Sequence, residues 1–316
     1  VVPRVKGGHR TGVFTFTTWD DARNIKAFMK QNSVQEAVIV GGGLIGLKSV
    51  EALVALGVKA TVVELADRIL SLTFDRTASD LAQAALAKAG VDVRCGTTVA
   101  EIRRAGGRVV GVTLRDGSTV PCGMVIFAIG VAPNERIVEG TPIEVARGIV
   151  VDEHMQTSVE GIFAAGDVAE ATDLISGEKR CIPILPTASR QGYIAGCNMA
   201  GRKRTYEGGM AMNAVDICGL PTISLGLTVP DGDGYEVLST SDEEAGVYKK
   251  LVLKGDRIVG AIFIGSIERA GIITGLIRDR ISVGGFKDML LTDEFGLISL
   301  PTEYRKHLVS GEGIEV

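Results

Sequence analysis

The chain lacks any apolar run that approaches the roughly 20 residues a helix needs to span a bilayer. Its longest such run, residues 37–47, is interrupted by glycines and is better explained by the motif described below. A long basic stripe is also missing, and the formal net charge is −4. Because nucleic-acid binding depends on clustered Lys and Arg side chains, we predict neither a nucleic-acid partner nor a membrane span.

Cysteine and histidine are scarce and scattered. The five cysteines form no C-x-x-C pair, and the three histidines lie far apart in the sequence. This pattern argues against a disulfide framework, a zinc site and an internal redox disulfide. We therefore predict no metal site, cysteines that behave as small apolar residues, and a reducing, cytoplasmic location. The residues concerned are Cys95, Cys122, Cys181, Cys197, Cys218, His9, His154 and His307.

A glycine-rich motif directly behind an apolar run is the most informative feature that is present. Residues 37–40 read Ala-Val-Ile-Val, and residues 41–46 read Gly-Gly-Gly-Leu-Ile-Gly, which is the pattern G-x-G-x-x-G. Gly41 allows a tight turn, Gly43 lets a pyrophosphate approach the backbone, and Gly46 lets a helix pack on the strand. The alternative is a glycine-rich turn between a strand and a helix that binds no ligand.

The segment after the motif favours a nucleotide. A helix is expected over residues 44–56, and its first residues, Leu44 and Ile45, aim free N–H groups and the positive dipole end at the phosphates. A strand over residues 58–63 then leads to Glu64. A carboxylate there accepts hydrogen bonds from a ribose 2′-hydroxyl and repels a 2′-phosphate, which predicts NAD(H) rather than NADP(H). Arg68 lies close in sequence and could weaken that preference.

Hydrophobic periodicity and turn residues predict the remaining elements. We expect strands over 13–16, 91–94, 125–129 and 162–165, helices over 19–30, 78–89, 188–200 and 267–278, and hairpins that join 109–114 to 119–120 and 248–253 to 257–264. The residues from about 301 read as a tail. We divide the chain into a lead-in (1–34), a nucleotide-binding domain (35–130), a third segment (131–205) and a C-terminal domain (206–316).

A second motif, Gly-Ile-Phe-Ala-Ala-Gly-Asp over residues 161–167, carries a family resemblance. Together with the G-x-G-x-x-G motif, residues 128–134 and the Gln191-Gly192 pair, it resembles the FAD- and NAD-dependent pyridine nucleotide–disulfide oxidoreductases. The resemblance covers nearly the whole chain. Residues 220–221 and 258–261 are similar to the branch with nitrite reductase flavin modules, rubredoxin reductases and NADH oxidases.

The resemblance implies an α/β fold in which a Rossmann-type NAD-binding domain is inserted in a partial FAD-binding domain. Residues 1–34 and 131–205 would be parts of the FAD domain, and residues 206–316 a C-terminal α+β interface domain. It implies that Gly130 lies at the NAD site. It also implies that Gly166 and Asp167 contact FAD, with the aspartate on the ribityl chain.

Two departures from the family pattern matter. The family opens with its own G-x-G-x-x-G unit for the ADP half of FAD, and nothing before Gly41 can serve. We therefore expect that the chain starts after that unit and that it binds FAD weakly or not at all by itself. The helix after the motif usually carries a glutamate that faces the nicotinamide, and here that position is Lys48. Lys48 is a candidate catalytic residue near the nicotinamide and equally a candidate solvated helix residue.

The leading hypothesis is a flavoprotein NADH oxidoreductase that transfers a hydride from NADH to FAD and onward to an unidentified protein or small-molecule acceptor. One alternative is a catalytically inactive fragment that binds NAD(H) but not FAD on its own. Another is an NAD dehydrogenase without flavin, for which no catalytic constellation is visible. Residues 125–129 and 162–165 read as interior strands, and loss of half of the flavin domain would expose their apolar surface. We therefore also predict a homo-oligomer with contacts through the C-terminal domain.

Overall fold

The computed structural model describes residues 5–8 and 11–300. The chain folds into two compact units. The first takes in the residues up to Ala132 together with Val215–Thr222, and the second takes in Pro133–Ala214 and the residues from Ile223 onward. The predicted division into four domains stays a prediction, although the first unit ends close to the boundary proposed at residue 130.

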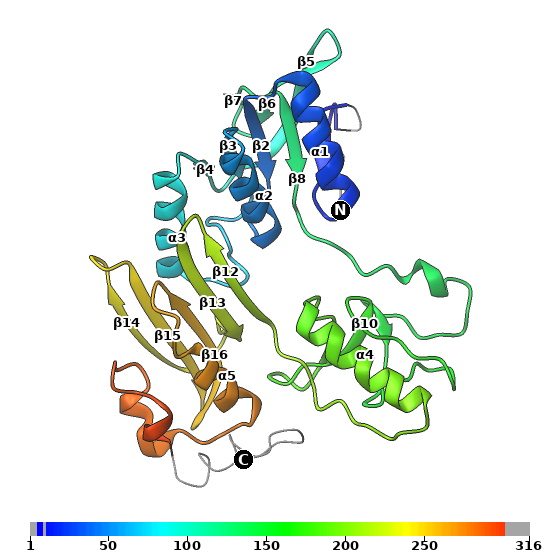
Figure 1. Cartoon of the computed structure of the whole chain (residues 1–316), viewed down its shortest axis with the longest axis vertical. Coiled ribbons are helices and arrows are strands. Elements are labelled where there is room, and N and C mark those ends of the chain that lie inside the picture. The colour runs from blue at the N-terminus through cyan, green and yellow to red at the C-terminus, as the bar shows by residue number, and fades with distance from the viewer. Residues whose placement is uncertain (1–4, 9–10, 301–316) are drawn as a thin grey trace. The chain divides into compact units, whose positions relative to one another are not determined.

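A five-stranded parallel sheet forms the centre of the first unit (Figure 1). The strand order is β1-β8-β2-β3-β4, and each neighbouring pair is parallel. The strands are β1 (Val13–Thr15), β2 (Glu36–Val40), β3 (Lys59–Val63), β4 (Asp92–Arg94) and β8 (Met124–Phe127), and the helices are α1 (Trp19–Asn32), α2 (Leu44–Ala55) and α3 (Arg76–Lys88). The expected Rossmann-type α/β fold is therefore confirmed, and β1, from the predicted lead-in, lies at the edge of this sheet.

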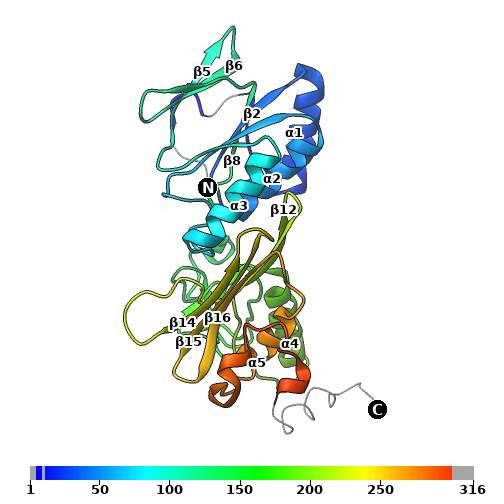
Figure 2. The ribbon, with the colours of Figure 1, turned by 90° about the vertical axis from the view of Figure 1, so that its left-hand side faces the viewer.

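Continuous apolar character explains why β2 lies in the middle of the sheet. Its last four residues are all buried, as expected for a strand that is covered on both faces. Val38 and Val40 pack with the antiparallel strands β5 (Val99–Ala105), β6 (Arg108–Leu114) and β7 (Thr119–Val120). Figure 2 shows these strands on one side of the parallel sheet and the three helices on the other. The predicted hairpin between β6 and β7 is confirmed, whereas β5 was not predicted.

The second unit contains a three-stranded sheet in the order β11-β10-β9. Its elements are β9 (Ile149–Val150), β10 (Ala169–Thr172), β11 (Lys179–Arg180), the 3₁₀ turn η1 (Glu135–Val138) and α4 (Leu185–Met199). Helix α4 packs on this sheet through Ile194 and Ala195. It begins three residues before the predicted start at 188.

The predicted strand over residues 162–165 is wrong. Ile162 is 43% exposed, and this segment forms only the single bridge between Phe163 and Gln156 among the described residues. Gly161 and Gly166 flank it with φ of +78° and +83°, conformations that interrupt an extended strand on both sides. Four apolar residues bounded in this way form a loop with one packed aromatic side chain.

The C-terminal part of the second unit is α+β, as the resemblance implies. A five-stranded sheet in the order β12-β13-β16-β15-β14 belongs to this part, except for Val215–Thr222 of β12 and β13, which are in the first unit, and α5 packs on the apolar face of β15 and β16. The elements are β12 (Met212–Ile217), β13 (Leu220–Gly226), β14 (Glu236–Asp242), β15 (Val247–Lys254), β16 (Arg257–Ile264), α5 (Ala270–Arg278), η2 (Gly284–Met289) and η3 (Leu297–Ser299). The β15–β16 hairpin is confirmed, whereas α5 begins three residues later than predicted.

In the part of the chain that the structure describes, none of the helices is both long and apolar enough to cross a membrane. The predicted tail from residue 301 lies outside the described residues.

Candidate functional site

The glycine motif forms the loop between β2 and α2. Gly41 has φ of +113°, and its N–H donates to the Val63 carbonyl at 2.8 Å, which holds the loop to the end of β3. A Cβ atom at Gly41 would overlap the carbonyl oxygen of Ala128, which follows β8. Only glycine fits here, both because φ is positive and because the neighbouring backbone is in contact.

Gly43 is different, because a Cβ atom there would meet nothing within 4 Å. It is the N-cap residue of α2, and no side chain caps this helix end. The N–H groups of the first turn, which include those of Leu44 and Ile45, have no acceptors within the helix itself. The first turn also carries no acidic residue. The arrangement leaves open space and a positive dipole end beside the backbone, which suits an anion.

The carboxylate of Glu64 is anchored at both oxygens next to this loop. Its Oε2 accepts the N–H of Gly42 at 2.5 Å, and its Oε1 accepts the N–H of Ala66 at 2.7 Å. The backbone of Glu64 is also fixed, since its N–H donates to the Arg94 carbonyl at 2.8 Å and its carbonyl accepts from Thr97 at 3.1 Å. The structure therefore brings the predicted acid and the glycine loop together.

Two arginines and an aspartate follow Glu64 and form an ion-pair cluster. Arg68 donates to Asp67 at 2.9 Å, and Arg76 pairs with the other oxygen of the same carboxylate. The charges of this cluster act on the thiol of Cys95. Burial, and then the negative charges of Glu64 and Asp67, raise the pKa of that thiol, and the positive charge of Arg76 offsets part of the increase. Arg68, which could weaken a preference for NAD(H), is thus engaged by Asp67.

Lys48 lies on α2 and is about half exposed. It forms an ion pair with Glu51 and donates to the Asp216 carbonyl at 3.3 Å. Glu51 in turn accepts the N–H of Cys218 at 2.7 Å. Glu51 was not identified from the sequence, because a glutamate on an exposed helix face usually signals only solvation. A role of Lys48 at a nicotinamide stays a prediction.

Gly130 follows β8 with φ of +102° and is exposed. A Cβ atom at this position would meet nothing within 4 Å. Because β8 and β2 are parallel neighbours, the residues that follow β8 lie at the carboxyl end of the sheet, as does the glycine loop that follows β2. Gly130, Gly41, Gly43 and Glu64 all belong to the first unit.

Gly166 and Asp167 belong to the second unit. The N–H of Gly166 donates to Oε1 of Gln191 at 2.8 Å, and Gln191 is only 2% exposed. Asp167 is exposed. Gln191 also hydrogen-bonds the buried Tyr206, whose pKa is raised by burial and lowered again in part by this bond. The anchoring role of Gln191 could not be read from the sequence, because its partner is a backbone group 25 residues away.

Helix α4 begins close to Gly166. A Cβ atom at Gly166 would lie 3.5 Å from the Cβ of Ala188, which is ordinary contact with the first turn. Ile184 caps α4 without a side-chain hydrogen bond, and the first turn holds no acid. The second motif therefore combines a left-handed glycine, an exposed carboxylate and a helix N-terminus.

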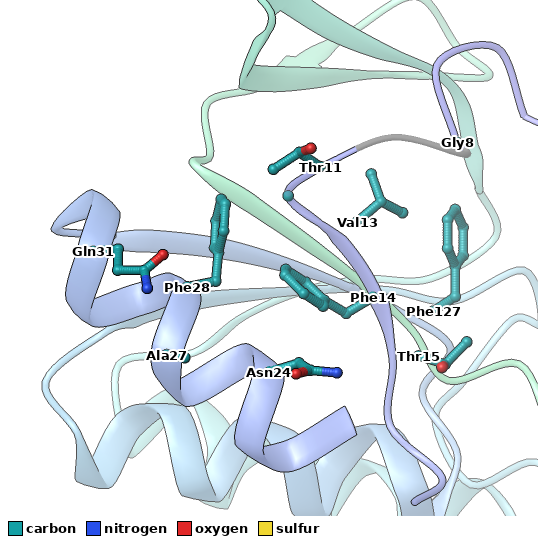
Figure 3. Close-up of a pocket in the computed structure, with 11 residues that line it drawn as sticks. Gly8, Thr11, Val13, Phe14, Thr15, Asn24, Ala27, Phe28, Gln31 and Phe127 are labelled. Atoms are coloured by element: carbon teal, nitrogen blue, oxygen red, sulfur yellow. The ribbon is translucent and has the colours of Figure 1, made fainter. Parts of the chain in front are cut away.

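An open hollow of about 880 Å³ lies between β1 and α1 (Figure 3). Phe14 and Phe28 lie side by side in its lining, with ring centroids 5.2 Å apart and ring planes tilted by 59°. None of the lining side chains is charged; the lining residues are Gly8, Thr11, Gly12, Val13, Phe14, Thr15, Asn24, Ala27, Phe28, Gln31 and Phe127. The hollow thus offers no acid or base, and it lies at the β1 edge of the sheet, three strands away from β3.

The sequence matches two family models. Residues 1–192 match the model described as pyridine nucleotide-disulphide oxidoreductase. Residues 212–281 match the model described as rubredoxin NAD+ reductase C-terminal domain. Both compact units contain matched residues.

Individual relatives agree with these matches. The chain is 32% identical over 285 residues to NADH-dependent phenylglyoxylate dehydrogenase subunit epsilon of Aromatoleum evansii, with 88% of the chain and 66% of that protein covered. It is 35% identical over 240 residues to an NAD(P)H sulfur oxidoreductase (CoA-dependent) of Pyrococcus abyssi, with 75% and 53% covered. It is similar to the NAD-dependent persulfide reductase from A. fulgidus, with a TM-score of 0.84, 26% identity, and 92% and 57% coverage. The chain spans between half and two thirds of these relatives' length.

Proposed function

Because the chain belongs to the pyridine nucleotide-disulphide oxidoreductase family, we propose that it is a flavoprotein NADH oxidoreductase, which transfers a hydride from NADH to FAD and onward to an acceptor. In this proposal NAD(H) binds at Gly41, Gly43, Leu44, Ile45, Gly46, Glu64 and Gly130, and Gly166 and Asp167 contact FAD. The cofactors supply hydride and electron transfer when they are bound.

The open space at Gly43 carries the proposal. Beside it, the uncapped N-terminus of α2 offers N–H groups and no competing acid, so the donor set fits a pyrophosphate. Glu64 is oriented at the same loop by Gly42 and Ala66. Each carboxylate oxygen keeps a lone pair beyond its present hydrogen bond, which can accept a ribose hydroxyl.

The second motif fits the flavin part of the proposal. The left-handed backbone at Gly166 is held from behind by buried Gln191, and this leaves Asp167 exposed. An exposed carboxylate beside a glycine can accept hydrogen bonds from sugar-alcohol hydroxyls. These residues bind and orient. We assign no general acid or base, and Lys48 is a candidate electrostatic group at the nicotinamide.

For the electron acceptor we propose only a chemical class. The match of residues 212–281 to a rubredoxin reductase C-terminal domain favours a small redox protein, although a small molecule would serve the same chemistry. We also propose that the chain is cytoplasmic and forms a homo-oligomer. Light scattering at micromolar concentration tests the oligomeric state.

The nucleotide site is tested by NADH fluorescence titration of the chain and its Gly43→Ala variant. Because the added methyl group meets only open space, the variant should keep its fold and its thermal midpoint. We expect its Kd for NADH to rise about tenfold or more, since the methyl group occupies the pyrophosphate position. Gly123→Ala is the matched control, because its Cβ would make only ordinary contacts with Val34 at 3.6 Å. Equal affinity in both variants would refute the site.

The flavin part is tested separately with a visible absorption spectrum, recorded after addition of FAD and then of NADH. A flavin spectrum that NADH bleaches supports oxidoreductase activity of this chain. NADH binding without bound flavin supports the alternative, a chain that binds NAD(H) and is inactive by itself.

A further inference from the structure

The ion-pair cluster beside Glu64 bears on whether the site accepts NAD(H) or NADP(H). This inference rests on the proposed NAD(H) site. One carboxylate, that of Asp67, binds both guanidinium groups of the cluster. Arg76 additionally donates to the Asp67 carbonyl oxygen at 3.2 Å. Guanidinium groups are the side chains that best match a phosphate in shape and charge.

The cluster adjoins the ribose-binding acid. The backbone N–H of Ala66 donates to the Glu64 carboxylate, so the residue directly before Asp67 is held at Glu64. The loop after β4 also holds this segment, because the N–H of Gly96 donates to the Ala66 carbonyl at 2.7 Å. The charges of Glu64, Arg76 and Asp67 all act on the thiol of Cys95, so the cluster lies within electrostatic range of a 2′-phosphate on a ribose at Glu64.

The two arginines differ in freedom. The Arg68 side chain is 21% exposed and its guanidinium group also reaches the carbonyls of Phe74 at 3.4 Å and Ser71 at 3.5 Å. The Arg76 side chain is 55% exposed, and the carboxylate of Asp67 is its ion-pair partner. Removal of that carboxylate would leave Arg68 held by the two carbonyls. Arg76 would keep its hydrogen bond to the Asp67 carbonyl oxygen through Nη1, and its Nη2 would become available to a ligand.

We infer that Asp67 is a specificity-determining residue: it occupies and neutralises Arg68 and Arg76, and so prevents them from receiving the 2′-phosphate of NADP(H). When Glu64 is counted with the cluster, the two carboxylates balance the charge of the two guanidinium groups. The carboxylate of Glu64 repels a 2′-phosphate, and Asp67 removes the cations that could have compensated for that repulsion.

The test is the ratio of the Kd for NADPH to the Kd for NADH, measured by fluorescence titration of the chain and of Asp67→Asn. The substitution keeps the side-chain volume and removes one negative charge. We expect the ratio to fall roughly 3- to 10-fold at low ionic strength, because NADPH carries the additional phosphate. The shift should diminish in about 0.5 M salt, where exposed charges are screened.

Two further variants separate this mechanism from a general charge effect. Asp20→Asn, on α1, removes an aspartate that pairs with Arg23 at 3.6 Å outside the cluster, and should leave the ratio unchanged. The double variant Asp67→Asn/Arg76→Gln restores the charge balance, and should return the ratio towards that of the unmodified chain.

The inference is overturned if Asp67→Asn shifts the ratio no more than Asp20→Asn does, or if the double variant keeps the full shift. Its failure differs from failure of the proposed function. If the unmodified chain binds neither nucleotide, the proposed site is wrong. If it binds NADH and only the Asp67 ratio is unmoved, the site stands and the inference alone is lost.

Discussion

The α carbon of Gly46 lies against the carbonyl oxygen of Gly41, so close that a Cβ atom on Gly46 would overlap that oxygen. The contact joins the first turn of α2 to the end of β2 and sets the angle at which the helix leaves the sheet. It also separates two functions within one motif, because Gly46 is constrained by the protein's own backbone and Gly43 faces open space.

Gly46→Ala should therefore destabilise the fold. The methyl group can be accommodated only if α2 shifts away from β2, which costs about 2–3 kcal/mol in the free energy of unfolding. Urea denaturation followed by circular dichroism measures the loss, and Gly43→Ala serves as the comparison. Equal stability of the two variants would contradict the close packing of Gly46.

Glu51→Ala should cost more stability than Lys48→Ala. The first change leaves the N–H of Cys218 without its carboxylate partner, a loss of about 1–2 kcal/mol. The second removes an ion pair in which Lys48 is half exposed, and such pairs contribute less than about 1 kcal/mol. Hydrogen exchange should show faster exchange of the Cys218 amide in Glu51→Ala only. A larger loss in Lys48→Ala would reverse this ranking.

Gln191→Met should weaken the second unit. The side chain keeps its length, but the N–H of Gly166 loses its acceptor, at a cost of about 1–3 kcal/mol. Gln83→Met, on the exposed face of α3, is the matched control and should be nearly neutral. Thermal unfolding compares the two. If FAD binds, its affinity should also fall in Gln191→Met, since the loop before Asp167 is no longer held.

Cys122 should make stability depend on pH in the alkaline range. Burial raises the pKa of this thiol from 9.0 to about 12. The unfolded chain therefore loses the proton first as the pH rises. The stabilising contribution is present in full below about pH 9 and is lost between about pH 9 and 12, by about 1.4 kcal/mol per pH unit.

Cys122→Ala has no such thiol and should lack this part of the pH dependence. The stability difference between the two proteins, measured by urea denaturation from pH 8 to 10.5, should shift in favour of the variant as the pH rises. Parallel curves would show that the thiol ionises equally in both states.

The sequence predicted the first unit well because its signals are local. The strand–glycine–helix–strand order from β2 to β3 follows from apolar runs and glycines, and its boundaries agree to within one residue. Strand β5 was missed because Arg103 and Arg104 interrupt its apolar alternation, and because pairing with β6 and the bridge from Glu101 to Lys6, which local patterns do not reveal, stabilise it. Strand β14 was missed because most of its residues are exposed, so they carry no burial pattern.

The sequence predicted only those site residues that have a fixed spacing along the chain. Glycines of the motif and Glu64 have fixed spacing, and they do lie together. Gln191 and Glu51 act on backbone groups 25 and 167 residues away, so no spacing rule could have identified them. The predicted strand over 162–165 failed because the two glycines around it hold left-handed conformations, which apolar composition does not reveal.

The two hydrogen bonds on Glu64 also have a consequence for the thermodynamics of binding. A flexible glutamate would lose rotamer entropy when a ligand immobilises it, which costs about 0.5–1.5 kcal/mol. Here Gly42 and Ala66 already hold the carboxylate, so that entropy is lost on folding and not on association. A ribose would meet an acceptor that does not need to rearrange, so this part of the entropic cost of binding would not reduce the affinity.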